Sequence, residues 1–125
     1  MAATIFLIGR IIFGGFFLYN AYRHFTNLTS MTMYVTSKRV PFPKAAVITT
    51  GVMLALGGLA IVSGKFMILG MIILVLFLVP VAFAMHAFWK ETDPHMKAMQ
   101  IVQFSKDIAL AGALLMLIAI GLIIG

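Results

Sequence analysis

Long apolar runs separated by short charged segments dominate the chain. Four of these runs are long enough to cross a bilayer core of about 30 Å, which takes roughly 20 helical residues. They predict spans at about residues 4–24, 44–63, 66–88 and 104–124, with interfacial loops over 25–43 and 89–103. We therefore expect one domain over residues 1–125, an all-α membrane protein. Its fold class is a four-transmembrane-helix antiparallel bundle with both termini on the same side.

Composition excludes a water-soluble domain. Of the 125 residues, 63% are hydrophobic and 10% are charged, whereas a soluble domain is about half apolar and a quarter charged. The net charge of +6 does not indicate nucleic acid binding, because the cations are scattered between apolar runs. Lipid headgroups are the partners that such cations fit. The absence of cysteine excludes every cysteine-ligated cofactor.

The loops differ strongly in length and charge. Ser63-Gly64-Lys65 is the whole break between the second and third spans and predicts a tight helical hairpin. The two long loops then share the opposite face, which carries Arg23, Lys38, Arg39, Lys44, Lys90, Lys97 and Lys106, against Lys65 alone on the hairpin face. Because cytoplasmic loops are enriched in cations, we predict cytoplasmic long loops, external termini and a location in the prokaryotic inner (plasma) membrane.

The second long loop contains a helix start. Thr92 or Asp93 is placed to cap the helix, with Pro94 in the first turn, where a missing N–H costs nothing. No proline follows Pro94, so one helix can run through an amphipathic stretch into the last span. We expect the apolar face of that stretch to carry Met96, Met99, Ile101 and Phe104, and the polar face Lys97, Gln100 and Gln103.

Small residues and one proline mark the expected helix contacts. Close packing is predicted at Gly14-Gly15 in the first span, at Gly51, Ala55, Gly57 and Gly58 in the second, and at Ala109, Gly112 and Ala113 in the fourth. Pro80 should bend the third span, and the bend could open a cavity.

Polar residues gather where the spans meet the long-loop face. Asn20 and His24 share a helix face at the end of the first span, His86 and Trp89 end the third, and Asp107 opens the fourth. One interpretation is an aromatic belt around polar side chains that hold the helices together. Another is a site for the polar head of a quinone, lipid or isoprenoid, in which His86 donates to the ligand and Asp107 fixes its tautomer. A metal or haem held by His24 and His86 is a third.

From the residues alone we assign Asn20, His24, His86, Trp89 and Asp107 as the candidate quinone or lipid head-group cluster, with no catalytic residue and no metal site. Arg10 is the one charge inside a span. It is interpreted as an anchor that reaches the outer headgroups, or as a contact for a partner subunit or an anionic ligand. An ion pair with Asp107 is not expected, because Asp107 belongs to the opposite face.

Several segments together resemble the DoxX family of small bacterial and archaeal membrane proteins. They are Arg10 with Gly14, Tyr19-Asn20-Ala21, His24-Phe25, Pro41-Phe42-Pro43, Phe77 to Pro80, His86-Ala87-Phe88-Trp89, and Phe104 to Gly112. The most specific parts are the His-x-Phe-Trp segment and the segment around Lys106. The chain departs from the family pattern at Ala21, where glycine is usual, and at Asp107, where asparagine is usual.

The resemblance implies a four-helix membrane bundle associated with respiratory or redox machinery, and it brings no agreed catalytic residues. The leading hypothesis is an accessory subunit of a membrane redox complex that contacts quinone or lipid, with membrane protein subunits as partners. One alternative is a stand-alone lipid-, isoprenoid- or quinone-binding protein or enzyme, with His86 and Asp107 as acid and base. The other is a structural or assembly factor acting through Gly57 and Gly112. An enzyme activity of its own is left open.

Overall fold

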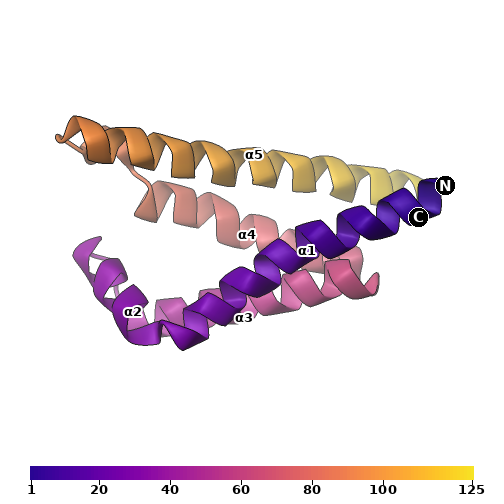
Figure 1. Cartoon of the computed structure of the whole chain (residues 1–125), viewed down its shortest axis with the longest axis horizontal. Coiled ribbons are helices and arrows are strands. Elements are labelled where there is room, and N and C mark those ends of the chain that lie inside the picture. Colours follow the sequence, from indigo (N-terminus) through magenta and orange to yellow (C-terminus); the bar gives the residue numbers. More distant parts are fainter.

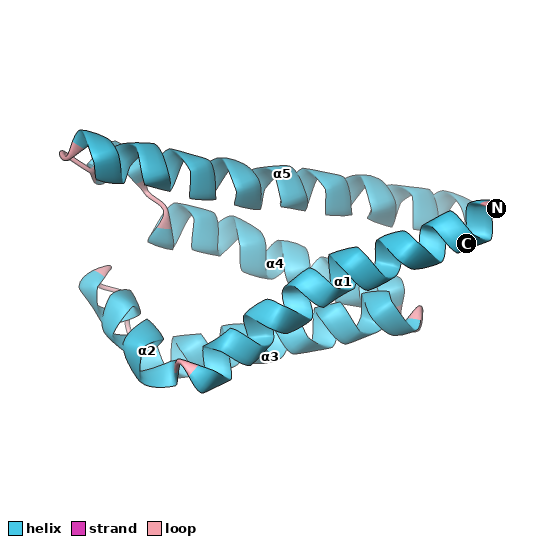
Figure 2. Ribbon diagram, in the orientation of Figure 1, coloured by secondary structure: helices cyan, strands magenta, loops and turns pink.

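The structure, a computed structural model, describes residues 1–125 and consists of helices joined by short turns (Figures 1 and 2). Four helices are long and apolar enough to span a membrane: α1 (Ala2–Thr26), α3 (Pro43–Ser63), α4 (Met67–Met85) and α5 (Pro94–Ile124). Two short elements, α2 (Leu28–Ser37) and η1 (Phe88–Lys90), lie between them. Both termini lie at one end of the bundle (Figure 1). The predicted all-α membrane fold with four spans is confirmed.

Local signals explain where the helices begin and end. Asp93 caps α5 by accepting a hydrogen bond from the Met96 N–H at 3.0 Å, and Pro94 takes the first helical position, as predicted. At the hairpin between α3 and α4, Gly64 ends α3 with φ of 77°, a left-handed conformation that glycine adopts without strain. Its N–H bonds the carbonyl of Ala60, so the turn satisfies one of the free carbonyls at the end of α3.

The spans pack in the order α1, α3, α4, α5, each against the next. The backbones of α1 and α5, the first and last members of this row, stay apart along most of their length, although Lys106 of α5 lies over the ring of Phe16 of α1. In Figure 1 the two helices are far apart at the long-loop end and approach each other toward the termini. The bundle is therefore an open row of helices, and it leaves space between its outer members.

Glycines set the close approach of α1 to α3. A Cβ added at Gly14 would lie 2.9 Å from the carbonyl oxygen of Gly58, and one added at Gly58 would lie 3.0 Å from the carbonyl oxygen of Gly14. Gly57 faces the side chain of Leu74 on α4. Gly112, by contrast, has no neighbouring atom within 4 Å of such a Cβ and lies on the exposed face of α5. Gly57 is thus an internal packing residue, and a test of partner contacts belongs at Gly112.

The core is small for the length of the chain. Its centre is formed by side chains from all four spans: Phe17, Leu54, Leu74, Leu78, Ala111 and Leu114. Only 20 of 125 residues are buried, and large apolar side chains remain exposed along every span. This is the distribution expected of a protein whose outer surface faces lipid hydrocarbon.

The long-loop end departs from the sequence prediction in one respect. The helix α5 does continue from its cap into the membrane, but the polar face assigned to its first turns is wrong for Gln100. Gln100 is 4% exposed, whereas Met96 and Met99 are exposed. Gln100 lies seven residues before Asp107 and fourteen before Leu114, both of which are buried, so it shares their inward face. Its amide is buried because it has polar partners there.

Candidate functional site

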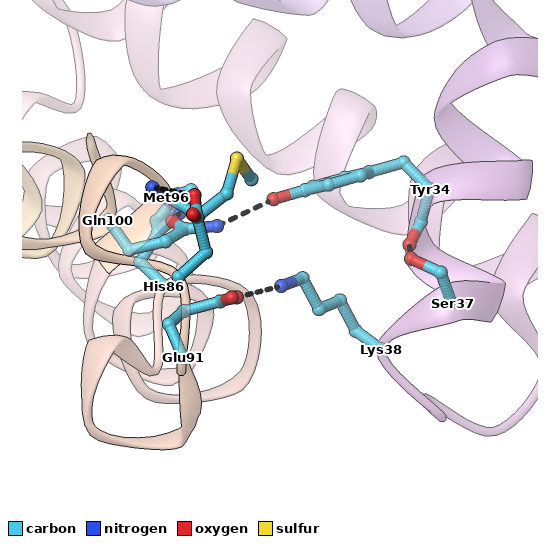
Figure 3. Close-up of polar contacts among 8 residues, drawn as sticks. Tyr34, Ser37, Lys38, His86, Glu91, Met96 and Gln100 are labelled. Atoms are coloured by element: carbon cyan, nitrogen blue, oxygen red, sulfur yellow. Dashed lines mark hydrogen bonds and ion pairs between the residues drawn. The ribbon is translucent and has the colours of Figure 1, made fainter. Parts of the chain in front are cut away.

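A chain of three polar side chains connects α2, the end of α4 and α5 (Figure 3). Gln100 lies at its centre. The Nε2 of Gln100 donates to the hydroxyl oxygen of Tyr34 at 3.1 Å, and its Oε1 lies 2.8 Å from Nδ1 of His86. The residues come from positions 34, 86 and 100, so only the folded bundle brings them together.

The chemistry of the amide fixes the direction of these bonds. An amide oxygen only accepts, so Nδ1 of His86 donates to Gln100. Tyr34 accepts from Gln100 through its oxygen, which leaves its own hydroxyl proton free for another acceptor. Tyr34 is therefore the member of this chain that can donate to a bound molecule.

Asp107 lies behind His86 in the interior of the bundle. Its side chain is 7% exposed, and one oxygen is 3.6 Å from Nε2 of His86 while the other is 3.8 Å from Nζ of Lys106. Both distances are longer than a hydrogen bond, so these contacts are electrostatic. The structure brings His86 and Asp107 together, as the sequence indicated. Nδ1 of His86 donates to Gln100 and Nε2 faces Asp107, so the single N–H of the neutral ring is used within the protein. A direct hydrogen bond from His86 to a ligand stays a prediction.

His24 is held differently. The side chain of Asn20 donates back to the carbonyl of Phe16 at 2.8 Å, and Nδ1 of His24 donates to the carbonyl of Asn20 at 2.8 Å. In the neutral ring this arrangement leaves Nε2 as a hydrogen-bond acceptor, and Nε2 has no protein partner. Asn20 thus orients His24 through its backbone, and its amide is used within α1.

Trp89 lies outside the polar chain. It is 49% exposed and packs among Phe83, Phe88 and Phe104, with ring centroids 5.1 to 6.0 Å away. These edge-on and tilted contacts connect η1 to α4 and α5. The position fits an aromatic anchor at the membrane boundary.

An ion pair holds the end of α2 to the second long loop. Nζ of Lys38 lies 3.3 Å from Oε1 of Glu91, with both side chains about one-fifth exposed (Figure 3). Together with the Tyr34–Gln100 bond, it gives α2 two polar connections across to the α4–α5 side of the bundle.

Beneath α2 lies a cavity of about 320 Å³ between α1, α2, α3 and α4. Its wall is mostly apolar, and Pro80 of α4 forms part of it. The polar lining residues are His24, Tyr34, Thr50 and His86. The hydroxyl of Thr50 already donates to its own helix. The cavity is thus a hydrocarbon-like space. Among the side chains that line it, Tyr34 has an unused hydroxyl proton and His24 has an unused ring nitrogen.

Of the five residues predicted from sequence, His24 and His86 line this cavity and Asp107 contacts His86 from behind. Asn20 and Trp89 do not line it. Sequence reasoning missed Tyr34 and placed Gln100 on the wrong face. The seven-residue spacing from Gln100 to Asp107 to Leu114 could have revealed the inward face of α5, but no comparable signal marked Tyr34. No group of three His, Asp or Glu side chains gathers anywhere in the chain.

Comparison with known proteins gives one match. The family model described as DoxX matches residues 5–87, which include Asn20, His24, Tyr34 and His86 and end before Trp89 and the whole of α5. No curated protein and no solved structure matches the chain.

Proposed function

Because the chain belongs to the DoxX family, we propose that this multi-pass membrane protein binds the polar head of a quinol in the cavity beneath α2. In this proposal it acts as an accessory subunit of a membrane redox complex in the prokaryotic inner membrane, with its long loops in the cytoplasm. The observation that carries the proposal is the pairing of one free donor and one free acceptor in an apolar cavity.

The hydrogen-bonding groups match the reduced form of such a ligand. A quinol carries two hydroxyls at opposite ends of a flat ring, and each hydroxyl both donates and accepts. One hydroxyl can donate to Nε2 of His24, and the other can accept from Tyr34. An oxidised quinone has only acceptor oxygens, so it would leave Nε2 of His24 unpaired. The site therefore favours quinol over quinone.

The size of the cavity supports a ligand held by its head. About 320 Å³ is at the small end of the range for small-molecule sites. It accommodates a ring and its substituents, while an isoprenoid tail would continue between the helices into lipid. The apolar wall suits the ring faces. Hydrogen bonds from Gln100 to Tyr34 and from His86 to Gln100 hold that side of the cavity in place.

The test is binding of ubiquinol-1 and ubiquinone-1, which carry a single isoprenoid unit, to the purified full chain in detergent. We expect the quinol to bind about tenfold more tightly than the quinone, since one hydrogen bond to a buried group is worth about 1 kcal/mol or more. Tyr34→Phe and His24→Phe should each weaken quinol binding by a similar factor. Tyr22→Phe is the matched control, because Tyr22 is exposed on α1 and outside the cavity.

Equal binding of the two forms, or binding unchanged in Tyr34→Phe and His24→Phe, would overturn the assignment of the head-group site. Native mass spectrometry of protein extracted gently from its own membrane tests the accessory role. Redox subunits that copurify support it. A chain that carries a quinol or another isoprenoid but no partner subunit would support the stand-alone binding protein. A chain that carries no ligand, and whose copurifying partners are lost in Gly112→Leu, would support the assembly factor.

A further inference from the structure

A second and larger cavity lies at the opposite end of the bundle, where the termini meet. Its volume is about 560 Å³, and it occupies the space between the outer helices α1 and α5, with α4 and the end of α3 as its floor. The lining is apolar except for one side chain, Arg10. Nothing in the proposed quinol site uses this cavity.

The guanidinium of Arg10 is bound to the end of α3, but only some of its N–H donors have partners there. Its Nε donates to the carbonyl of Ile61 and its Nη2 to the carbonyl of Val62, both at 3.1 Å. These are two of the carbonyls that a helix end leaves without partners. A guanidinium carries five N–H donors, so three remain. No carboxylate of the chain forms an ion pair with Arg10.

The position of Arg10 is recessed from the end of the bundle. In Figure 1 the turn between α3 and α4 stops short of the ends of α1 and α5, which project beyond it. Arg10 lies against this turn, because a Cβ built at Gly64 would be 2.9 Å from its Nη2. The next residue, Lys65, adds a second cation, and no acidic side chain lies in this hairpin or in the first turns of α1. This end of the bundle therefore presents a positive recess that continues into an apolar groove.

We propose that this groove binds an anionic phospholipid, with the phosphate on Arg10 and one acyl chain between α1 and α5. The free guanidinium donors match a phosphate, which accepts several hydrogen bonds at once. The apolar lining matches the acyl chain.

Charge argues against a second copy of this chain as the occupant. The three acidic residues, Glu91, Asp93 and Asp107, all belong to the long-loop end, so a copy with the same membrane orientation would bring no carboxylate to Arg10.

The experiment compares the lipids retained by the full chain in native mass spectrometry after incubation with phosphatidylglycerol or phosphatidylcholine of identical acyl chains. We expect wild type to retain phosphatidylglycerol about tenfold better. Arg10→Gln removes the charge but keeps an amide NH2 group as a hydrogen-bond donor, and it should lose this preference, whereas Arg10→Lys should keep part of it. Arg23→Gln is the matched control, a lost cation at the other end of the same helix.

A second variant tests the groove itself without removing the cation. Gly9 lines the cavity, and a Cβ added there meets no atom within 4 Å. Gly9→Leu combined with Ala113→Leu should therefore fill the groove and lower retention of both lipids while the helical fold is kept. The proposal would be overturned if the double variant retained both lipids as well as wild type does, or if wild type retained the two lipids equally. It would also be overturned if wild type formed a dimer that the double variant dissociates. The quinol assay above is read at the other end of the bundle, so the two proposals fail independently.

Discussion

Substituting Gly14 by alanine should separate α1 from α3 and destabilise the bundle. The added Cβ would lie 2.6 Å from Cγ2 of Val62, 2.9 Å from the oxygen of Gly58 and 3.1 Å from the nitrogen of Val62. A side chain can rotate away, but two of these three atoms belong to the backbone of α3. The helices must therefore move apart, and overpacking of this kind costs about 1–3 kcal/mol.

The neighbouring glycine supplies the control. A Cβ at Gly15 meets no atom within 4 Å, so Gly15→Ala changes only helix propensity, which favours alanine by up to about 1 kcal/mol. The same gain partly offsets the clash in Gly14→Ala. The two variants carry the same chemical change one residue apart, and we expect Gly14→Ala to be less stable than Gly15→Ala by about 1–3 kcal/mol.

The assay is unfolding in mixed micelles with increasing sodium dodecyl sulfate, followed by fluorescence of Trp89, the single tryptophan, and by circular dichroism. Val62→Ala in the Gly14→Ala background should restore only part of the stability, because the contact with the Gly58 oxygen remains. Equal unfolding free energies for Gly14→Ala and Gly15→Ala would refute the close packing of α1 on α3. Full rescue by Val62→Ala would show that the backbone contact is unimportant.

Three further predictions concern the long-loop end. Gln100→Leu should cost about 1–3 kcal/mol in unfolding free energy, because it leaves two polar partners unpaired. The control, Gln103→Leu at a partly exposed position, should change the unfolding free energy by less than about 0.5 kcal/mol. Equal effects of the two substitutions would contradict the inward position of Gln100. Asp93→Ala should cost about 1 kcal/mol through the lost cap of α5, and circular dichroism should report fraying of its first turns. A double-mutant cycle of Lys38→Ala and Glu91→Ala should give a coupling of no more than about 1 kcal/mol that decreases with salt, and a larger or salt-independent value would refute a partly exposed ion pair.

The sequence by itself determined the number of spans, the shared side of the termini and the start of α5. Each of these depends on a local quantity: the length of an apolar run, the parity of the spans, or a cap such as Asp93 followed by proline. The sequence also placed His86 and Asp107 at the same membrane face, because the third span ends at the face where the fourth span begins. Their contact followed once α4 packed against α5.

Only the tertiary structure decided which side of each span faces inward. Lipid and protein core are both apolar, so a membrane helix carries little of the amphipathic pattern that orients a helix in water. Gln100 was assigned to the wrong face for another reason: its polar partners, His86 and Tyr34, come from other elements of the fold. Tyr34, on a helix between two spans, was not recognised as a site residue for the same reason. The carbonyl partners of Arg10 were equally invisible, since they belong to the backbone of another helix more than fifty residues away and have no sequence signature.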